Sequence, residues 1–167
     1  MLPSLIALPI LGLLVVFQSA VVSRLPLLHG TADIVLLVVI AWALQDRVRS
    51  AWQWSILGGL FVGFVSALHF SIPVLSYMMI TGLVLIVKRR VWQVPILAMF
   101  AMTFVGTLFN LTLSALAVSL GGATLPLLDT LRLIILPSLI LNLLLAAPIY
   151  AMVRDLAEWV YPEEIKI

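Results

Sequence analysis

The 167-residue sequence contains no cysteine and few charged residues, and each shortage excludes a class of protein. Without cysteine, the chain can form neither a disulfide framework nor a thiolate metal site, and it has no cysteine nucleophile. Only 10% of the residues are charged, whereas a soluble domain uses roughly a quarter of its residues to cover its surface. Because 64% of the residues are hydrophobic and the mean hydropathy is +1.27, we expect a surface that faces lipid.

Groups that could carry chemistry are also scarce. Every Asp and Glu is expected in a loop, at an interface or in the C-terminal tail, which leaves no paired carboxylates and no buried acid for proton coupling. Ser66 and His69 lie one turn apart, but no oxyanion-hole signature accompanies them. No cluster of His, Asp and Glu has the spacing of metal ligands. The nine Lys and Arg form no dense patch, so nucleic acid is not an expected partner. We predict a protein that is not an enzyme and has no cofactor.

Long uninterrupted apolar runs are present instead. A bilayer core of about 30 Å takes about 20 helical residues, and runs of this kind do not alternate as the strands of a membrane barrel would. The predicted fold is all-α: one polytopic transmembrane domain over residues 1–167, a bundle of about six helices with a tail at 154–167. The predicted spans lie at about 2–23, 25–44, 52–68, 71–87, 92–120 and 133–153.

The segment 25–44 is less regular than the others. Pro26, His29, Gly30 and Asp33 disturb its first third, so we expect a helix that begins irregularly near one interface and then spans the membrane. If this segment does not cross, the chain has five spans and the N-terminus lies outside. The distribution of basic residues does not decide between five and six.

The basic residues do indicate an orientation. With six spans and the N-terminus inside, seven of the nine Lys and Arg fall in cytoplasmic segments, and only Arg24 and Arg132 fall outside. Both counts of spans place the Lys88 loop and the tail after Arg154 in the cytoplasm. All five tryptophans then lie near the cytoplasmic interface, where amphipathic rings settle.

The polar and small residues within the spans are typical of helix packing. Asn110 and Asn142 can form hydrogen bonds between helices, and their expected role is packing of the bundle. Gly59 and Gly63, continued by Ala67, form a ridge without large side chains that lets another helix approach, either internal or from a partner. Pro148 and Pro137 lie on either side of Asn142 in the last span. Each removes a backbone donor, and the Asn142 amide is a candidate to satisfy the freed carbonyls.

Three segments together resemble the MreD family, the rod shape-determining membrane proteins of bacteria. They are Arg24-Leu-Pro-Leu followed by Thr31-Ala-Asp-Ile-Val-Leu-Leu37, the helix with Gly59-Leu-Phe-Val-Gly63, and Asn142-Leu-Leu-Leu-Ala-Ala-Pro148-Ile-Tyr150 with Arg154 beyond it. The family often carries an Asp after the glycines of its third span, where this chain has Ala67. Any role of that acid is therefore not carried over.

The resemblance implies a non-enzymatic scaffold of the cell-elongation machinery in the bacterial inner membrane, with a cytoplasmic C-terminus. Its implied partners are the transmembrane helix of an MreC-like protein, RodA, a class B penicillin-binding protein and MreB filaments. The family is similar in fold to the substrate-binding S components of energy-coupling-factor vitamin transporters, which supplies the alternative function. S components typically carry Ala-x-x-x-Ala on the first span, but this chain has only Ala7 and Ala20 there.

Overall fold

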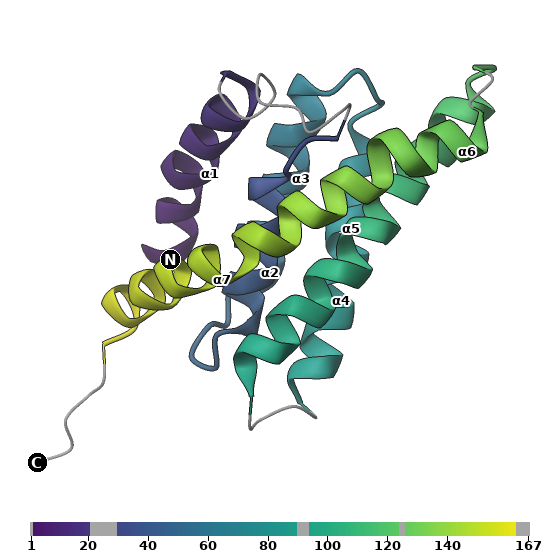
Figure 1. Ribbon diagram of the computed structural model, residues 1–167. Helices are drawn as coiled ribbons and strands as arrows, with labels where there is room; N and C mark the ends of the chain where they lie inside the picture. The colour runs from purple at the N-terminus through teal and green to yellow at the C-terminus, as the bar shows by residue number, and fades with distance from the viewer. Residues whose placement is uncertain (1, 21–29, 90–93, 124–125, 163–167) are drawn as a thin grey trace, which may run out of the picture.

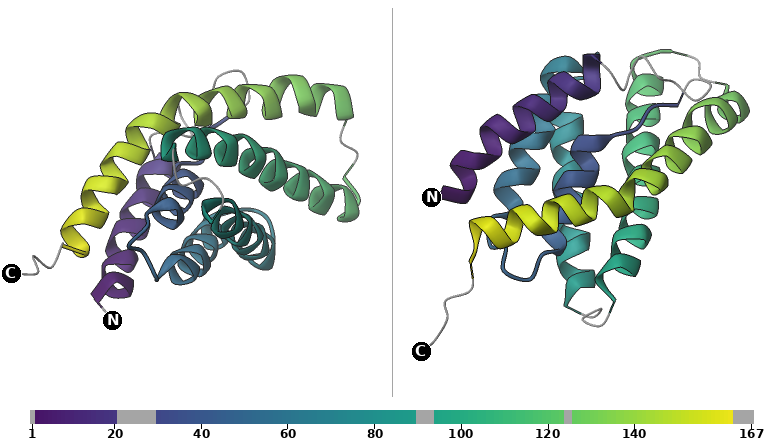
Figure 2. Two further views of the ribbon diagram at one scale, coloured as in Figure 1. Left: turned by 90° about the horizontal axis from the view of Figure 1, so that it is seen from below. Right: turned by 60° about the vertical axis from the view of Figure 1, so that its left-hand side comes forward.

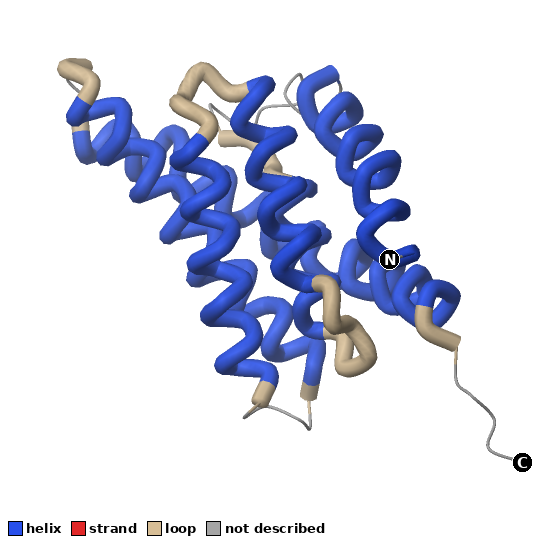
Figure 3. Tube along the Cα trace, turned by 180° about the vertical axis from the view of Figure 1, so that it is seen from behind, coloured by secondary structure: helices blue, strands red, loops and turns tan. Residues whose placement is uncertain are grey.

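The computed structural model describes residues 2–20, 30–89, 94–123 and 126–162 of the chain. These residues form a bundle of helices and contain no β-strand (Figures 1 and 3). Three of the helices, at Ser71–Lys88, Pro95–Leu120 and Thr130–Val160, are long and apolar enough to cross a membrane. The predicted all-α class with membrane-spanning helices is therefore confirmed. The apolar helices Leu5–Ala20, Ile34–Leu44 and Ala51–Val65 are shorter than the predicted spans.

The helix bounds add detail to the predicted segments 25–44 and 154–167. The described elements are α1 (Leu2–Ala20), α2 (Ile34–Leu44), α3 (Ala51–Val65), α4 (Ser71–Lys88), α5 (Pro95–Leu120), α6 (Leu127–Asp129), the π-helix η2 (Thr130–Ile135) and α7 (Leu136–Val160). The irregular first third expected for the segment 25–44 agrees with the described residues, because α2 begins only after Asp33, whose side chain caps it. At the other end of the chain, α7 continues to Val160, so residues 154–160 extend the last helix.

The helix α2 is the centre of the bundle. Ten of its eleven residues are buried, and it has no polar side chain. A helix that is apolar on every face is stable only when other helices surround it, and α1, α3, α4, α5 and α7 all contact α2. Figure 2 shows α2 enclosed by the other helices from two further directions. The longer helices α1, α3, α4, α5 and α7 therefore pack around the short helix α2.

The helices α3 and α4 form an antiparallel pair joined by residues 66–70 (Figure 1). Their backbones approach closely because α3 has glycine where α4 crosses it. A Cβ atom on Gly59 would lie 2.6 Å from the Cα of Val74, and one on Gly63 would lie 2.8 Å from the Cα of Phe70. Real Cβ atoms are not found at such distances, so side chains at these positions would separate the two helices.

The two ends of the bundle differ in charge. The basic end is formed by the α2–α3 connection, the last turn of α4 and the last turns of α7, and it carries Arg47, Arg49, Lys88, Arg89 and Arg154. Of the Lys and Arg in the described ranges, Arg132 alone lies near the other end, which is formed by residues 66–70, 121–123 and 126–129. We call this other end the neutral end.

Side chains at the basic end join helices that are distant in sequence. The rings of Trp42 and Trp54 stack with their centroids 4.1 Å apart, and the indole N–H of Trp42 donates to Ser50 Oγ at 3.2 Å. Ser50 in turn lies 3.3 Å from the Tyr161 hydroxyl that follows α7. The Lys88 ammonium donates to the backbone carbonyls of Ala43 and Gln45, which end α2. These contacts connect α2, α3, α4 and α7 at the basic end.

Candidate functional site: a polar cluster around Asp33

Residues 30–33 form an extended segment, here called the strap, that enters the bundle from the neutral end and leads into α2 (Figure 1). The strap lies directly against α7. A Cβ atom on Gly30 would lie 2.6 Å from the backbone nitrogen of Ser138, so only glycine fits this approach. The next N–H, of Thr31, donates to Ser138 Oγ at 3.0 Å. Glycine and serine thus hold the strap against the last helix.

The carboxylate of Asp33 receives hydrogen bonds from several elements. The Tyr77 hydroxyl of α4 donates to Oδ1 at 2.8 Å, with Oδ2 at 2.9 Å, and Asn110 of α5 donates from Nδ2 to Oδ2 at 3.2 Å. Within α2, the N–H of Leu36 donates to Oδ1 at 3.0 Å. Gln18 of α1 makes a longer contact of 3.5 Å from Nε2. Since each of these partner groups donates a hydrogen bond, the carboxylate acts only as an acceptor.

The same cluster satisfies the backbone N–H groups that open α2. The first turn of a helix leaves its N–H groups without partners inside the helix. Here Val35 donates to Gln18 Oε1 at 3.1 Å, Leu36 donates to the Asp33 side chain, and Leu37 donates to the Asp33 carbonyl at 3.1 Å. The start of α2 is therefore capped by protein groups from α1 and from the strap.

The asparagines of α5 and α7 complete the cluster. Asn142 is 1% exposed; its Oδ1 accepts from the Asp33 N–H at 2.8 Å, and its Nδ2 donates to Thr107 Oγ1 at 2.9 Å. Asn110 also accepts from Ser76 of α4 at 2.8 Å. Segments of the chain 109 residues apart, one containing Asp33 and the other Asn142, meet through a single hydrogen bond.

Asp33 lies well inside the bundle. The eleven residues of α2 extend for about 16 Å from Asp33 to the basic end, at 1.5 Å per residue. Its partner Tyr77 lies about 9 Å from the start of α4 by the same measure. As predicted, Asp33 lies in a non-helical segment. That segment does not stay at the interface, because the strap carries non-helical backbone into the bundle and ends there.

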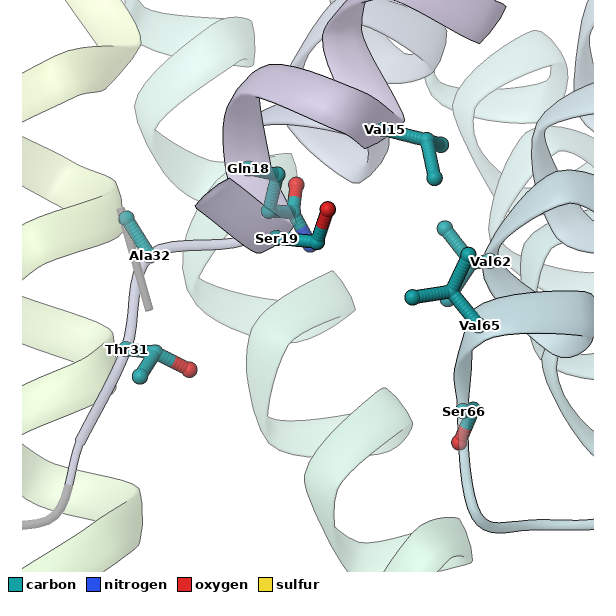
Figure 4. A pocket seen from close by; sticks show the side chains of 8 residues that line it. All are labelled: Val15, Gln18, Ser19, Thr31, Ala32, Val62, Val65 and Ser66. Carbon is teal, nitrogen blue, oxygen red and sulfur yellow. The ribbon is translucent and has the colours of Figure 1, made fainter. Parts of the chain in front are cut away.

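Two cavities adjoin the strap at the neutral end. The outer cleft, of about 390 Å³, opens between α1, the strap and α3 (Figure 4). The inner cavity, of about 100 Å³, lies between the strap, α5 and α7 and reaches Asp33, Thr107, Ser138 and Asn142. Gln18, Thr31 and Ala32 line both. Figure 4 shows Gln18 and Ser19 of α1 between the strap and the valines of α3.

The glycine ridge predicted on the third span contacts α4, within the chain. Gly59 and Gly63 face the backbone of α4, and both are buried. The ridge does not continue to Ala67, because α3 ends at Val65 and Ala67 is exposed in the following connection. Ser66 and His69 do not pair either: His69 Nδ1 lies 2.7 Å from Ser71 Oγ, and Ser66 Oγ accepts from the Leu68 N–H.

Asn142 does not satisfy carbonyls freed by the two prolines. Its hydrogen bonds go to Asp33 and Thr107 on neighbouring elements, which agrees with the expected role in packing the bundle and not with the alternative of a local repair within α7. Pro148 is exposed inside an unbroken α7, and Pro137 lies in the first turn of that helix. The π-helical residues Thr130–Ile135 come immediately before it, where the Leu136 N–H donates to the Leu131 carbonyl, five residues back. A π-helical turn thus precedes Pro137.

Sequence reasoning found the asparagines but missed two partners of the cluster. Ser76 and Tyr77 were not predicted to form hydrogen bonds between helices. One signal was present in the sequence: several neutral polar residues lie within apolar spans, and each needs a partner in the absence of water. Which residues meet depends on the helix arrangement, which periodicity does not give.

The cluster and the bundle define a class of protein: an all-helical membrane protein with a hydrogen-bonded polar centre. Among the described residues, no group of three or more His, Asp or Glu could hold a metal ion. No family model, curated protein or solved structure matches this chain.

Proposed function

We propose that this protein is a non-enzymatic membrane scaffold of the bacterial cell-elongation complex, of the kind that the MreD resemblance implies. The observation that supports it most is the meeting of Asp33 with Asn142. These residues belong to two of the three segments on which the resemblance rests, so their contact gives the shared pattern a structural reason. The side chains around Asp33 form hydrogen bonds with one another.

In this proposal the chain crosses the bacterial inner membrane six times, with the basic end in the cytoplasm. The alternating directions of α1, α2, α3, α4, α5 and α7 (Figure 1) and the five basic residues gathered at one end support it. The short helices α2 and α3 cross together with their connecting segments. The proposed partners are the single transmembrane helix of an MreC-like protein, RodA, a class B penicillin-binding protein and, directly or indirectly, MreB filaments.

Site-specific photocrosslinking in cells tests the scaffold. A photoreactive amino acid replaces side chains that face outward from different helices: Leu13, Phe64, Met79 and Leu144, each more than half exposed. We expect adducts with an MreC-like protein from neighbouring helices on one side of the bundle only, since a single helix covers one side. Buried Leu36, at 0% exposure, is the matched negative position. Adducts from no outward position, or equally from all of them, would contradict the scaffold.

A second candidate function is that of an S component of an energy-coupling-factor vitamin transporter. The observation that favours it is the outer cleft of about 390 Å³, with Gln18, Ser19, Thr31 and Ser66 in its lining. Purification from native membranes followed by mass spectrometry separates the two functions. Wall-elongation proteins in the purified complex support the scaffold, and a pair of ATPases supports the transporter.

A further inference from the structure

Two buried hydroxyl groups line the inner cavity, and the O–H of each donates no hydrogen bond within the described residues. Thr107 and Ser138 are 1% and 2% exposed, and both line the cavity. Each hydroxyl oxygen accepts one hydrogen bond, Thr107 from the Asn142 amide and Ser138 from the Thr31 N–H. Across the described part of the chain, neither hydroxyl donates to an acceptor.

Such donors require an acceptor in the cavity. Leaving a buried polar group unsatisfied costs about 1–3 kcal/mol, and the α5 and α7 backbones offer these hydroxyls no bond. The neighbouring hydroxyls of Ser76 and Tyr77 do not share this need, because they donate to Asn110 and Asp33. Within the cluster, the unused donors are therefore confined to the side that faces the cavity. The buried hydroxyls of Ser55, Thr81 and Thr103 also lack a partner among the described residues, but they line neither cavity.

The cavity has the size and the chemistry of a water site. A water molecule occupies about 30 Å³ in the liquid and needs two to four polar partners, so the roughly 100 Å³ of the inner cavity suits a few molecules. Thr107 and Ser138 supply donors, while the carbonyl oxygen of Asn142 and the carboxylate of Asp33 supply acceptors. Non-helical backbone at membrane depth is also tolerated where it lines a cavity that contains water, which is the position of the strap.

We propose that the inner cavity is a water site which exchanges with solvent through the outer cleft, from the neutral end only. The two cavities share Gln18, Thr31 and Ala32, so side chains of α1 and the strap lie between them. From the basic end the path is closed by the apolar α2, whose residues from Val35 to Leu44 are buried. Asp33 is thereby reached by water from one side of the membrane. This inference does not depend on the proposed scaffold function.

Single cysteines test the proposal, because the native chain has none. Thr107→Cys places a thiol in the cavity, and Thr103→Cys places one a helical turn away, at a threonine that is 0% exposed and lines neither the inner cavity nor the outer cleft. The probe is the silver ion, added to sealed vesicles of either orientation. We expect Thr107→Cys to react at least about tenfold faster than Thr103→Cys, because only a solvated thiol ionises readily. Addition at the neutral end should be the faster of the two.

A third variant guards against loss of folding. Ala32→Cys lines both cavities and removes no hydrogen bond, and Ser138→Cys repeats the test on α7. Thermal unfolding in detergent identifies the variants that fold. If folded Ala32→Cys and Thr107→Cys are as slow to react as Thr103→Cys, the cavity is dry and the proposal is overturned. Faster reaction from the basic end would overturn the proposed route.

Discussion

At the scale of single residues, Asp33 organises the protein. Its carboxylate and its backbone N–H bind side chains from α4, α5 and α7, and Gln18 of α1 binds both Asp33 and the first turn of α2. A polar network inside a membrane bundle stabilises when every member has a partner and destabilises when one member is lost. The cluster should therefore respond strongly to conservative substitution.

Asp33→Asn is expected to destabilise the fold by about 1–3 kcal/mol, although the shape of the side chain is kept. One carboxylate oxygen becomes an NH₂ group, which then faces another donor, either the Tyr77 hydroxyl or the Asn110 amide. Thermal unfolding in detergent measures the loss. Asp46→Asn at the exposed end of α2 is the matched control and should leave stability unchanged. Equal stability of the two variants would show that the cluster does not depend on the carboxylate.

Asn142→Leu is expected to cost stability through two partners at once. The Asp33 N–H and the Thr107 hydroxyl both lose their bonds to the amide, and each lost buried bond typically costs about 1–3 kcal/mol. On the scaffold proposal, recovery of an MreC-like protein in a pull-down falls as well. Leu144→Ala is the control, because Leu144 lies on the same helix and its side chain is 70% exposed. Intact stability together with intact pull-down would contradict the assignment of Asn142.

The sequence predicted some of this site and not the rest, for a physical reason. Asn110 and Asn142 stand out because an amide within an apolar span needs a partner. Asp33 did not stand out, because Pro26 and Gly30 before it favour an irregular segment near the interface. Whether that segment stays at the interface or enters the bundle depends on Gly30 fitting against Ser138. That contact joins residues more than a hundred positions apart, so the local sequence pattern could not predict it.

At the scale of secondary-structure elements, the α3–α4 pair depends on close backbone approach. Helix order and most helix ends were predictable, because runs of apolar residues separated by charges mark them. The ridge was predictable too, but its occupant was left open between an internal helix and a partner. The occupant is α4, since Val74 and Phe70 lie against Gly59 and Gly63.

Gly59→Ala tests this packing. The added Cβ would lie 2.6 Å from the Cα of Val74, so the helices must separate, and overpacking of this kind costs about 1–3 kcal/mol. Gly12→Ala in α1 is the control, because a Cβ there has nothing within 4 Å; it should be neutral or stabilising by up to about 1 kcal/mol. Urea or thermal unfolding in detergent compares the two. Similar results for both variants would rule out the tight crossing.

At the scale of the whole molecule, the gathering of basic residues at one end predicts the orientation in the membrane. His69 and Arg89 are both exposed and lie at opposite ends of α4. We expect His69→Cys to react with an impermeant thiol reagent added outside intact cells, and Arg89→Cys to react only after the membrane is opened. The reverse pattern would invert the orientation. Glu164→Cys, in the predicted tail and outside the described residues, tests the same side of the membrane a second time.

The shortness of α2 has a consequence for biosynthesis. Its eleven apolar residues are fewer than the roughly 20 that enter a membrane on their own, and Asp33 stands at their front. The partners that make this position tolerable are synthesised later, Asn110 by 77 residues and Asn142 by 109. A nascent chain truncated after Leu120 should therefore remain sensitive to proteolysis in a pulse-chase experiment, while the full chain becomes resistant. The hydrogen bonds at the start of the second helix are therefore complete only after the last helix has been synthesised.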